Sequence, residues 1–509
     1  MKVKKIIALL LVICMIICLT ACGGKKAGDD KDTLTIAFGA DRGTLDPMHL
    51  IGFDSMIAIR MIYEPLWDID AEGNMHYVLA TNLEYVEPTV WHVTIREGVK
   101  FSNGNPLTAE DVVNSLYLGN HRTGESDYLP ELNLDKTKAL DDKTVEIVFN
   151  SYDLSYVTTM ISLPIIDKES YDETKIMTTP IGTGPYKLDE YVVNSHINLS
   201  RRDDYWGDKP VIKNLEFRVY SEQSQMTNAI TTGEVDISKV PFQDIPFVQE
   251  LKDYTVDLHE TAQSTTMYFN TTENSFFYKN PDARKAVALA IDQQAIADIA
   301  YSGFAEPSVM PLSVGNIDTK ESYKNIGVYG MGHDVEKAKE LADKSGLTGQ
   351  TVVLITDGSP DFILCAESIQ SDLKEIGVTV DIHNYDSGSA ADVYTDPTMY
   401  DMAMSFTYTP SETIAQNMYA WVLFANAGIY ATSEWEGRDR YLELIDGIMA
   451  ISDPAELDAR YQELIEIHEN AMIWYSLVDK QAALAYNSNL NGYAQNIMGN
   501  VNYDELSWK

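Results

Sequence analysis

The chain of 509 residues is longer than one hydrophobic core usually organises, so we expect two or three domains. Its composition, 45% hydrophobic and 10% aromatic, is that of a packed globular protein. The formal net charge of −39 argues against nucleic acid and against an anionic membrane surface as partners. We interpret this acidity as a source of solubility rather than as a sign of a cationic ligand.

The N-terminus has the three parts of a bacterial lipoprotein signal. Three lysines among the first five residues precede an apolar run at residues 6–19, and Leu19-Thr20-Ala21-Cys22 then forms a lipobox. This run is shorter than the roughly 20 residues that a membrane-spanning helix needs. We therefore predict that residues 1–21 are removed as a signal peptide and that the Cys22 thiol carries a diacylglyceryl anchor. Residues 22–32 would then be a polar tether.

Cysteine usage excludes a disulfide within the mature chain. Cys14 and Cys18 leave with the signal peptide and Cys22 is acylated, so Cys365 remains alone. The apolar residues on both sides of Cys365 favour a buried small side chain over a reactive nucleophile.

Strand and helix patterns alternate along the rest of the chain and predict a mixed α/β protein. Alternating apolar residues indicate the strands. Thr108 followed by Asp111 is typical of a capped helix start, and so is Asp453 before Pro454. The expected strands cover residues 33–38, 91–95, 144–149, 215–219, 351–355 and 378–382, and a further helix covers 366–377.

Sequence motifs of catalysis are absent from the mature chain. It has no G-x-S-x-G elbow, no H-E-x-x-H pair and no C-x-x-C. Residues 182–187 (GTGPYK) lack the Gly-Lys-Ser/Thr ending of a phosphate loop, and Pro185 removes a backbone N–H that a phosphate would need. We therefore expect a binding protein rather than an enzyme, with no cofactor and no metal site.

Several segments, in order, carry a resemblance that covers essentially the whole mature chain. They are Leu45-Asp46-Pro47, Ile62 to Leu66, Trp91 to Ser115, Pro180 to Tyr186, Asp204-Tyr205-Trp206-Gly207, Gly233 to Asp236, Met267 to Asn270, Asp282 to Asp292 and Met399 to Met404. With these segments the chain resembles the large solute-binding protein family 5, whose members serve peptide, nickel and oligosaccharide ABC importers.

The resemblance implies an α/β fold of the periplasmic-binding-protein type, with two lobes around a deep cleft and an extra subdomain in lobe I. Two chain crossings join the lobes, and hinge closure encloses the ligand. Within the Pro180 to Tyr186 motif, Gly182 and Gly184 suit positive φ. The expected domains are a lobe I core at 33–52, 180–263 and 484–509, its subdomain at 53–179, and lobe II at 264–483.

In peptide-binding relatives two cleft-edge segments lie on either side of the ligand, and their backbones can pair with it as strands do. Here one segment follows the Leu-Asp-Pro motif and the other follows the Tyr-Asp-Met-Ala motif. The alternative for each candidate is ordinary loop and core packing. The ligand-binding residues that the resemblance implies are Ile51, Gly52, Phe53, Tyr268, Phe406, Thr407, Tyr408 and Trp421.

One departure from the peptide-binding pattern bears on the ligand. Peptide-binding relatives place an aspartate downstream of the Tyr-Asp-Met-Ala motif, where it pairs with the free α-ammonium of the peptide. The corresponding position is Pro410, and the nearest acid in the loop is Glu412. An α-ammonium buried without a counter-charge is strongly unfavourable. We therefore expect a blocked peptide, an oligosaccharide or a metal chelate rather than a peptide with a free amino group.

The implied function is capture of a small solute and its delivery to the permease and ATPase subunits of an ABC importer. The protein is expected to act as a monomer on the outer face of the cytoplasmic membrane of a host with a single membrane. A ligand sensor or chaperone of the same fold and a lipid-anchored hydrolase are the alternatives, since fold alone does not settle function.

The lipobox leads to a test of anchoring. Replacing Cys22 with alanine removes the thiol that would receive the lipid. The Cys22→Ala chain should therefore appear in the soluble extracytoplasmic fraction or accumulate as an unprocessed precursor, as measured by fractionation and intact-mass spectrometry. A variant that is still processed and anchored like the wild type would contradict the lipoprotein interpretation.

Overall fold

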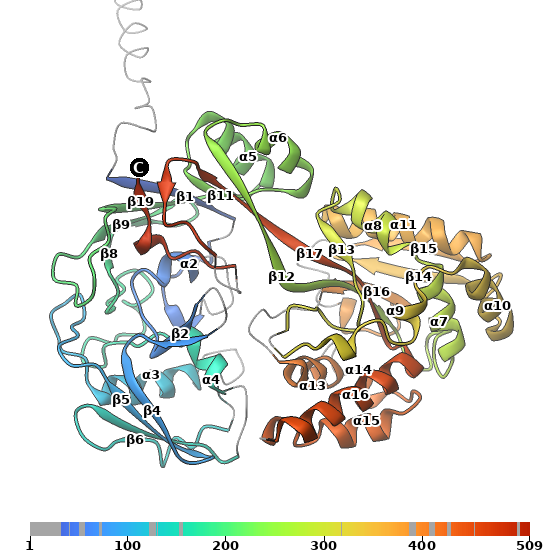
Figure 1. Cartoon of the computed structure of the whole chain (residues 1–509), viewed down its shortest axis with the longest axis horizontal. Helices are drawn as coiled ribbons and strands as arrows, with labels where there is room; N and C mark the ends of the chain where they lie inside the picture. Colours follow the sequence, from blue (N-terminus) through green and yellow to red (C-terminus); the bar gives the residue numbers. More distant parts are fainter. Residues whose placement is uncertain are drawn as a thin grey trace, which may run out of the picture.

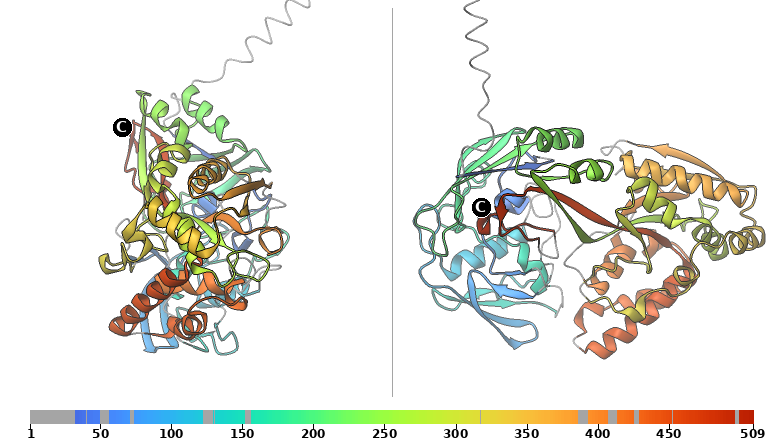
Figure 2. Two further views of the ribbon diagram at one scale, coloured as in Figure 1. Left: turned by 90° about the vertical axis from the view of Figure 1, so that its right-hand side faces the viewer. Right: turned by 45° about the horizontal axis from the view of Figure 1, so that its top comes forward.

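The computed structural model describes residues 32–39, 41–49, 56–70, 74–121, 129, 131–151, 156–316, 318–385, 393–406, 413–424, 429–451, 453–495 and 499–509. Two lobes joined by two long strands are visible in Figure 1, and the right-hand view of Figure 2 shows the same division. The blue and green segments and the C-terminus form the first lobe, and the yellow and orange segments form the second. This two-lobed α/β architecture is the fold that the family resemblance implies.

One large mixed sheet runs through both lobes. Its strands follow one another in the order β15-β14-β16-β12-β17-β11-β1-β10-β9-β8, and β13 pairs with β17 beside this path. This spatial order differs from the order along the chain, so distant segments meet in the sheet. The strands are β1 (Thr33–Phe38), β8 (Tyr186–Val192), β9 (His196–Arg201), β10 (Asn214–Val219), β11 (Ile237–Lys239), β12 (Tyr254–Phe269), β13 (Ala305–Pro307), β14 (Thr351–Thr356), β15 (Thr379–Asn384), β16 (Met402–Phe406) and β17 (Trp474–Asn487).

The strands β12 and β17 belong to both lobes and run antiparallel to each other. Their pairing begins at Tyr254 with Asn487 in the first lobe and continues into the second lobe, with a register shift between Glu260 and Ser264. Figure 1 shows this pair crossing from one lobe to the other. An irregular register bends a strand pair locally, so the crossing has a natural place to bend.

In the first lobe the sheet lies between two hydrophobic clusters. Leu34 and Ile36 of β1 point into the main core of the lobe. Ala37, on the opposite face, packs into a smaller cluster with α5 (Gln223–Thr232) and α6 (Ile245–Gln249). The alternation along β1 therefore places one layer on each side of the sheet.

A subdomain with its own antiparallel sheet, in the order β4-β5-β7-β6, is inserted after β1. Its helix α3 begins after Thr108, whose backbone N–H donates to the Asp111 carboxylate at 2.7 Å, so the predicted cap is confirmed. Trp91 is buried and its ring meets Phe149 edge to face, with centroids 4.7 Å apart. The elements are β4 (Ala80–Glu87), β5 (Val90–Ile95), α3 (Ala109–Gly119), β6 (Lys138–Ala139) and β7 (Thr144–Val148).

The glycines of the Pro180 to Tyr186 motif are required for a reason other than the expected positive φ, and that expectation is wrong. Neither Gly182 nor Gly184 has positive φ. A Cβ on Gly182 would lie 2.0 Å from the Ile62 carbonyl oxygen, and a Cβ on Gly184 would lie 2.6 Å from that of Met61. The Gly184 N–H donates to the Ile62 carbonyl at 2.8 Å. Two backbones cross here in direct contact, and only glycine leaves room for the crossing.

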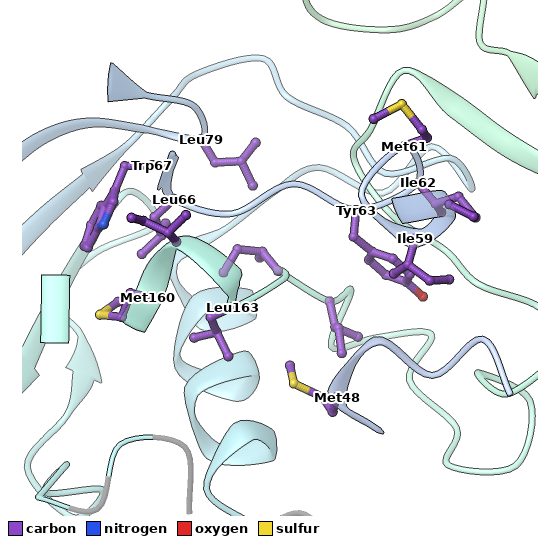
Figure 3. Close-up of a cluster of buried hydrophobic side chains, with 14 of the residues drawn as sticks. Met48, Ile59, Met61, Ile62, Tyr63, Leu66, Trp67, Leu79, Met160 and Leu163 are labelled. Carbon is purple, nitrogen blue, oxygen red and sulfur yellow. The ribbon is translucent and has the colours of Figure 1, made fainter. Parts of the chain in front are cut away.

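A buried cluster ties the turn after β1 to the subdomain. Figure 3 shows Met160 and Leu163 beside Leu66 and Trp67, with Met48 below them. All five side chains belong to the main core of the first lobe and are almost fully buried. Met48 lies in the short turn η1 (Pro47–His49), so this cluster fixes the chain just before the first predicted ligand-binding segment.

In the second lobe, helices cover both faces of the sheet. Met402 and Met404 of β16 pack against α7, α8, α10 and α11, whereas Ala403 faces α13, α14, α15 and α16. The predicted cap of the last helix is confirmed, because the Asp453 carboxylate accepts the Ala455 N–H at 2.8 Å. The helices are α7 (Pro281–Ala290), α8 (Gln293–Ala300), α10 (Val335–Ser345), α11 (Pro360–Glu375), α13 (Ile414–Phe424), α14 (Ile429–Thr432), α15 (Arg438–Ile445) and α16 (Pro454–Ala471).

Short elements complete the described chain. They are α2 (Met56–Ile59), α4 (Tyr156–Thr159), α9 (Val328–Met331), β2 (Trp67–Ile69), β3 (Met75–Tyr77), β18 (Leu490–Asn491) and β19 (Ser507–Trp508), with 3-10 turns η2 (Met160–Ser162), η3 (Phe242–Asp244), η4 (Glu321–Tyr323), η6 (Ile448–Ala450) and η7 (Tyr503–Glu505). In the ranges given above, no helix has the length and apolar character needed to cross a membrane.

Asp504, in the turn η7 of the first lobe, allows a test of how the stability of the protein depends on pH. Burial, with Glu505 and Glu64 nearby, raises the pKa of Asp504 to about 6 from its usual 3.8. The folded state therefore favours the protonated form, and stability is lost as pH rises from about 4 through 6. Asp504→Asn should raise the free energy of unfolding at pH 7 by about 1–2 kcal/mol, and the gain should vanish near pH 4. Denaturant titrations at both pH values measure the change.

Glu169→Gln is the matched control, because it removes one exposed acid from the same lobe. It should change stability by less than about 0.5 kcal/mol at either pH. Equal stability of wild type and Asp504→Asn at pH 7 would show that the carboxylate is tolerated in the folded state.

Candidate ligand-binding site

In each lobe, the carboxyl ends of the parallel strands point toward the other lobe. In the first lobe β1 is parallel to β10 and β11. Because β11 pairs antiparallel with β17, which arrives from the second lobe, the carboxyl ends of all three strands point toward that lobe. Ligands of open α/β sheets bind outside the carboxyl ends of the strands.

The second lobe has the mirror arrangement. Here β14 is parallel to β15 and β16, and β16 pairs antiparallel with β12, which arrives from the first lobe. Phe406, the last residue of β16, pairs with Thr265 at the side of the lobe nearer the crossing. The carboxyl ends of the three strands therefore point back toward the first lobe, and the space between the two edges is the candidate site.

Most residues of the two predicted ligand-binding segments fall outside the description. Ile51, Gly52 and Phe53 lie outside the described residues, and so do Thr407 and Tyr408. Their flanks are described. The first segment follows the turn η1 after β1, and the second continues directly from β16. Strand pairing of these segments with a ligand stays a prediction.

Phe406 is a predicted site residue whose side chain is described. Its ring is 40% exposed, which is unusual for a phenylalanine at the end of a buried strand. The ring centroid lies 6.4 Å from that of Phe362 in α11, and the Lys480 Nζ atom lies 5.8 Å from the ring. Phe406 therefore offers a supported apolar surface at the edge that faces the first lobe.

Tyr268 and Trp421 differ from Phe406 in their setting. Tyr268 is 1% exposed and packs in the core of the second lobe, with its ring 6.1 Å from that of Tyr430. Burial raises the pKa of Tyr268 well above its usual value. Trp421 lies in α13, and its side chain is outside the description. The packing of Tyr268 fits the core alternative, and a ligand contact of either residue stays a prediction.

Asp46 of the Leu-Asp-Pro motif organises the turn η1 of the first lobe. Its buried carboxylate accepts the Met48 N–H at 3.0 Å and lies 2.8 Å from His49 Nδ1. The His49 side chain is 37% exposed, and only Leu50 separates this residue from the first predicted segment. Sequence reasoning missed His49, although its spacing from Asp46 within one turn was a usable signal.

The loop after β14 brings polar groups to the edge of the second lobe. The Thr356 hydroxyl donates to the Asn384 side chain at 2.8 Å, so the ends of β14 and β15 are linked. Gly358 has φ of +75°, and a Cβ there would lie 2.6 Å from the Tyr385 carbonyl oxygen. Asp357 then accepts both the Ser359 N–H and the Ser359 hydroxyl, at 2.9 and 2.6 Å. The loop is therefore held tightly before α11 begins.

Cys365 is packed as the sequence predicts. It is fully buried, its Sγ lies 3.9 Å from the Tyr301 hydroxyl, and burial raises the pKa of the thiol to about 12. The nucleophilic thiolate therefore does not form at physiological pH. Within the part of the chain that the structure describes, no cluster of three His, Cys, Asp or Glu side chains could hold a metal ion.

Comparisons with known proteins agree with this geometry. Residues 74–428 match the family described as "Bacterial extracellular solute-binding proteins, family 5 Middle". The glutathione-binding protein GsiB of Escherichia coli (strain K12) is 23% identical over an alignment of 490 residues, which covers 91% of this chain and 92% of GsiB. The chain therefore belongs to the family 5 solute-binding proteins, and its relatives are binding proteins of ABC importers rather than enzymes.

Solved structures show the same fold. NikA from Brucella suis, in complex with Fe(III)-EDTA, superposes with a TM-score of 0.83 at 20% identity, over 94% of this chain and all of NikA. DppA from Helicobacter pylori, in complex with the peptide STSA, has a TM-score of 0.77 at 22% identity, over 94% of this chain and 98% of DppA.

Phe406 leads to a test of the site. Phe406→Ala should lower the affinity for the solute that co-purifies with the chain by about tenfold, because an exposed aromatic contact is lost. Its unfolding free energy should fall by less than about 1 kcal/mol, since the ring is already partly in water. Calorimetric titration and denaturant unfolding measure the two quantities.

Phe362→Ala is the matched control, because this neighbouring ring is only 3% exposed. It should cost about 3–5 kcal/mol of stability, as expected for a buried phenylalanine. An unchanged affinity in Phe406→Ala would remove Phe406 from the site.

Proposed function

We propose that the protein is a lipid-anchored, extracytoplasmic solute-binding subunit that captures a small solute by lobe closure and delivers it to an ABC importer permease. One observation carries this proposal. The carboxyl-terminal edges of two parallel-strand groups face each other across a junction made by β12 and β17. A ligand between the edges would contact both lobes and would stabilise the closed arrangement.

The proposed domain division follows from the same crossing. The boundaries at 263/264 and 483/484 fall within β12 and β17. We propose that 33–52, 180–263 and 484–509 form the lobe I core, that 53–179 form its subdomain, and that 264–483 form lobe II.

The N-terminal sequence supports the anchor. Residues 1–31 lie outside the described residues, so the lipobox and the acylated Cys22 rest on sequence. A lipid-anchored subunit would be held within reach of its permease and ATPase partners by the tether at residues 22–32. We propose a monomer on the outer face of the cytoplasmic membrane of a single-membrane host.

The ligand belongs among small polar solutes. The relative GsiB is named for glutathione, and the structures of DppA and NikA contain the peptide STSA and Fe(III)-EDTA. Pro410 and Glu412, which bear on recognition of a free α-ammonium, lie outside the described residues. We propose a blocked or modified peptide, an oligosaccharide or a metal chelate, because the second segment places an uncharged proline where peptide-binding relatives carry an aspartate.

The departure at Pro410 leads to a test of ligand class. Two mixtures of the same short peptides, one with free and one with acetylated N-termini, are titrated calorimetrically into the protein. The acetylated mixture should bind at least as tightly as the free mixture, because no counter-charge is provided for an ammonium group. Micromolar binding that requires the free N-terminus would contradict the proposal, and its loss in Glu412→Gln would assign the missing charge to Glu412.

A further inference from the structure

Lys480 occupies an unusual place for a lysine, since it lies within the crossing strand β17. Its backbone pairs with Ala305 of β13, and its carbonyl accepts the Thr261 hydroxyl of β12 at 2.6 Å. The side chain is partly buried. The ammonium group is therefore held at the junction of the lobes by two neighbouring strands rather than carried on a mobile surface loop.

Among the side chains that the structure describes, none forms an ion pair or a hydrogen bond with the Lys480 ammonium group. The acids that act on it through space are Asp361 and Asp357, both in or beside the start of α11. These carboxylates have other partners, because Asp361 lies 3.4 Å from the Tyr301 hydroxyl and Asp357 holds Ser359.

A second lysine adds to the positive charge from the other lobe. Lys239 ends β11 in the first lobe, and its charge disfavours the ammonium form of Lys480. Burial of Lys480 and the charge of Lys239 both lower the pKa of Lys480, and burial has the larger effect. A partly desolvated ammonium group is stabilised when an anion binds it directly.

The surface next to the ammonium group is apolar and open. The Phe406 ring lies 5.8 Å from Lys480 Nζ and is 40% exposed. A cation held near an aromatic ring keeps its other side free for a second partner. Lys480 and Phe406 together therefore present a positive charge beside an exposed apolar ring at the edge that faces the first lobe.

We propose that Lys480 binds a carboxylate of the captured solute, with Phe406 contacting the apolar part of the solute next to that group. This inference rests on the proposed solute-binding function and narrows the ligand to an anion. The carboxylate would supply a counter-charge in direct contact with the ammonium group, which Asp361 and Asp357 supply only through space.

The protein as a whole is strongly acidic, with a formal net charge of −39. A carboxylate ligand is therefore repelled at long range, and this repulsion is screened by salt over about 10 Å at 0.1 M. Local attraction by Lys480 acts at contact distance, where screening is weaker. Among the described residues, Lys480 is the group proposed to supply this local attraction, which makes the proposal sensitive to one substitution.

The test uses the full chain purified in detergent and two N-acetylated tetrapeptide mixtures of identical sequences. One mixture has free C-terminal carboxylates and the other has C-terminal amides. The wild type should bind the carboxylate mixture at least tenfold more tightly by calorimetric titration. Lys480→Met and Lys480→Gln should both lose this preference, Lys480→Arg should retain it, and exposed Lys252→Met should behave like the wild type.

Thermal unfolding without ligand separates a binding role from a structural one. If Lys480 serves the ligand, Lys480→Met and Lys480→Gln should unfold at or above the wild-type temperature, because an unpaired cation is removed. A lower unfolding temperature in both variants, together with an unchanged preference for carboxylates, would overturn the proposal and leave Lys480 as a structural residue.

The remaining outcomes separate this inference from the function on which it rests. Equal wild-type affinity for the two mixtures would refute the carboxylate site while leaving solute capture intact. Binding of neither mixture would remove the peptide class from the proposed function, and the carboxylate inference would fall with it.

Discussion

Within the described chain, the sheet passes between the lobes through one antiparallel pair, β12 and β17, and the rest of the molecule depends on that pair. Backbone hydrogen bonds along the pair hold the two lobes in register. The shift between Glu260 and Ser264 interrupts that register between the lobes and gives the pair a place to bend.

The same pair decides where a ligand can bind. In the first lobe β11 runs antiparallel to β17, and in the second lobe β16 runs antiparallel to β12. The carboxyl ends of the parallel strands in both lobes therefore face the junction. A side contact supports the crossing, where the Phe242 ring of the first lobe meets the Tyr301 ring of the second edge to face, with centroids 5.2 Å apart. The junction therefore combines a bendable ribbon, a packed aromatic contact and a partly buried cation.

Local sequence signals predicted local structure well. The capped helix start at Thr108 and the Asp453 cap are present, because such caps depend only on residues a few positions apart. The role of Gly182 could not be predicted in the same way, since the backbone of Ile62 that excludes a side chain there lies 120 residues away and reaches it only in the folded core.

In the candidate site too, contacts between residues far apart in the sequence could not be predicted. The resemblance implied two cleft-edge segments, and the strand directions show that β1 and β16, the strands before them along the chain, end at facing edges. Lys480 carried no signal in sequence, because its closeness to Phe406 depends on the pairing of β17 and β16 with β12. The buried position of Tyr268 likewise follows from the packing of α14 on the sheet rather than from its neighbours in sequence.

The central claim is that the lobes close about the crossing strands when a ligand binds, with little change inside each lobe. Spin labels at Glu97→Cys in the first lobe and Asp439→Cys in the second report on this directly, because both native side chains are more than three-quarters exposed. Saturating ligand should shorten the distance between these labels, whereas a pair at Glu336→Cys and Asp439→Cys within the second lobe should keep its distance. An inter-lobe distance that stays the same with saturating ligand would contradict closure.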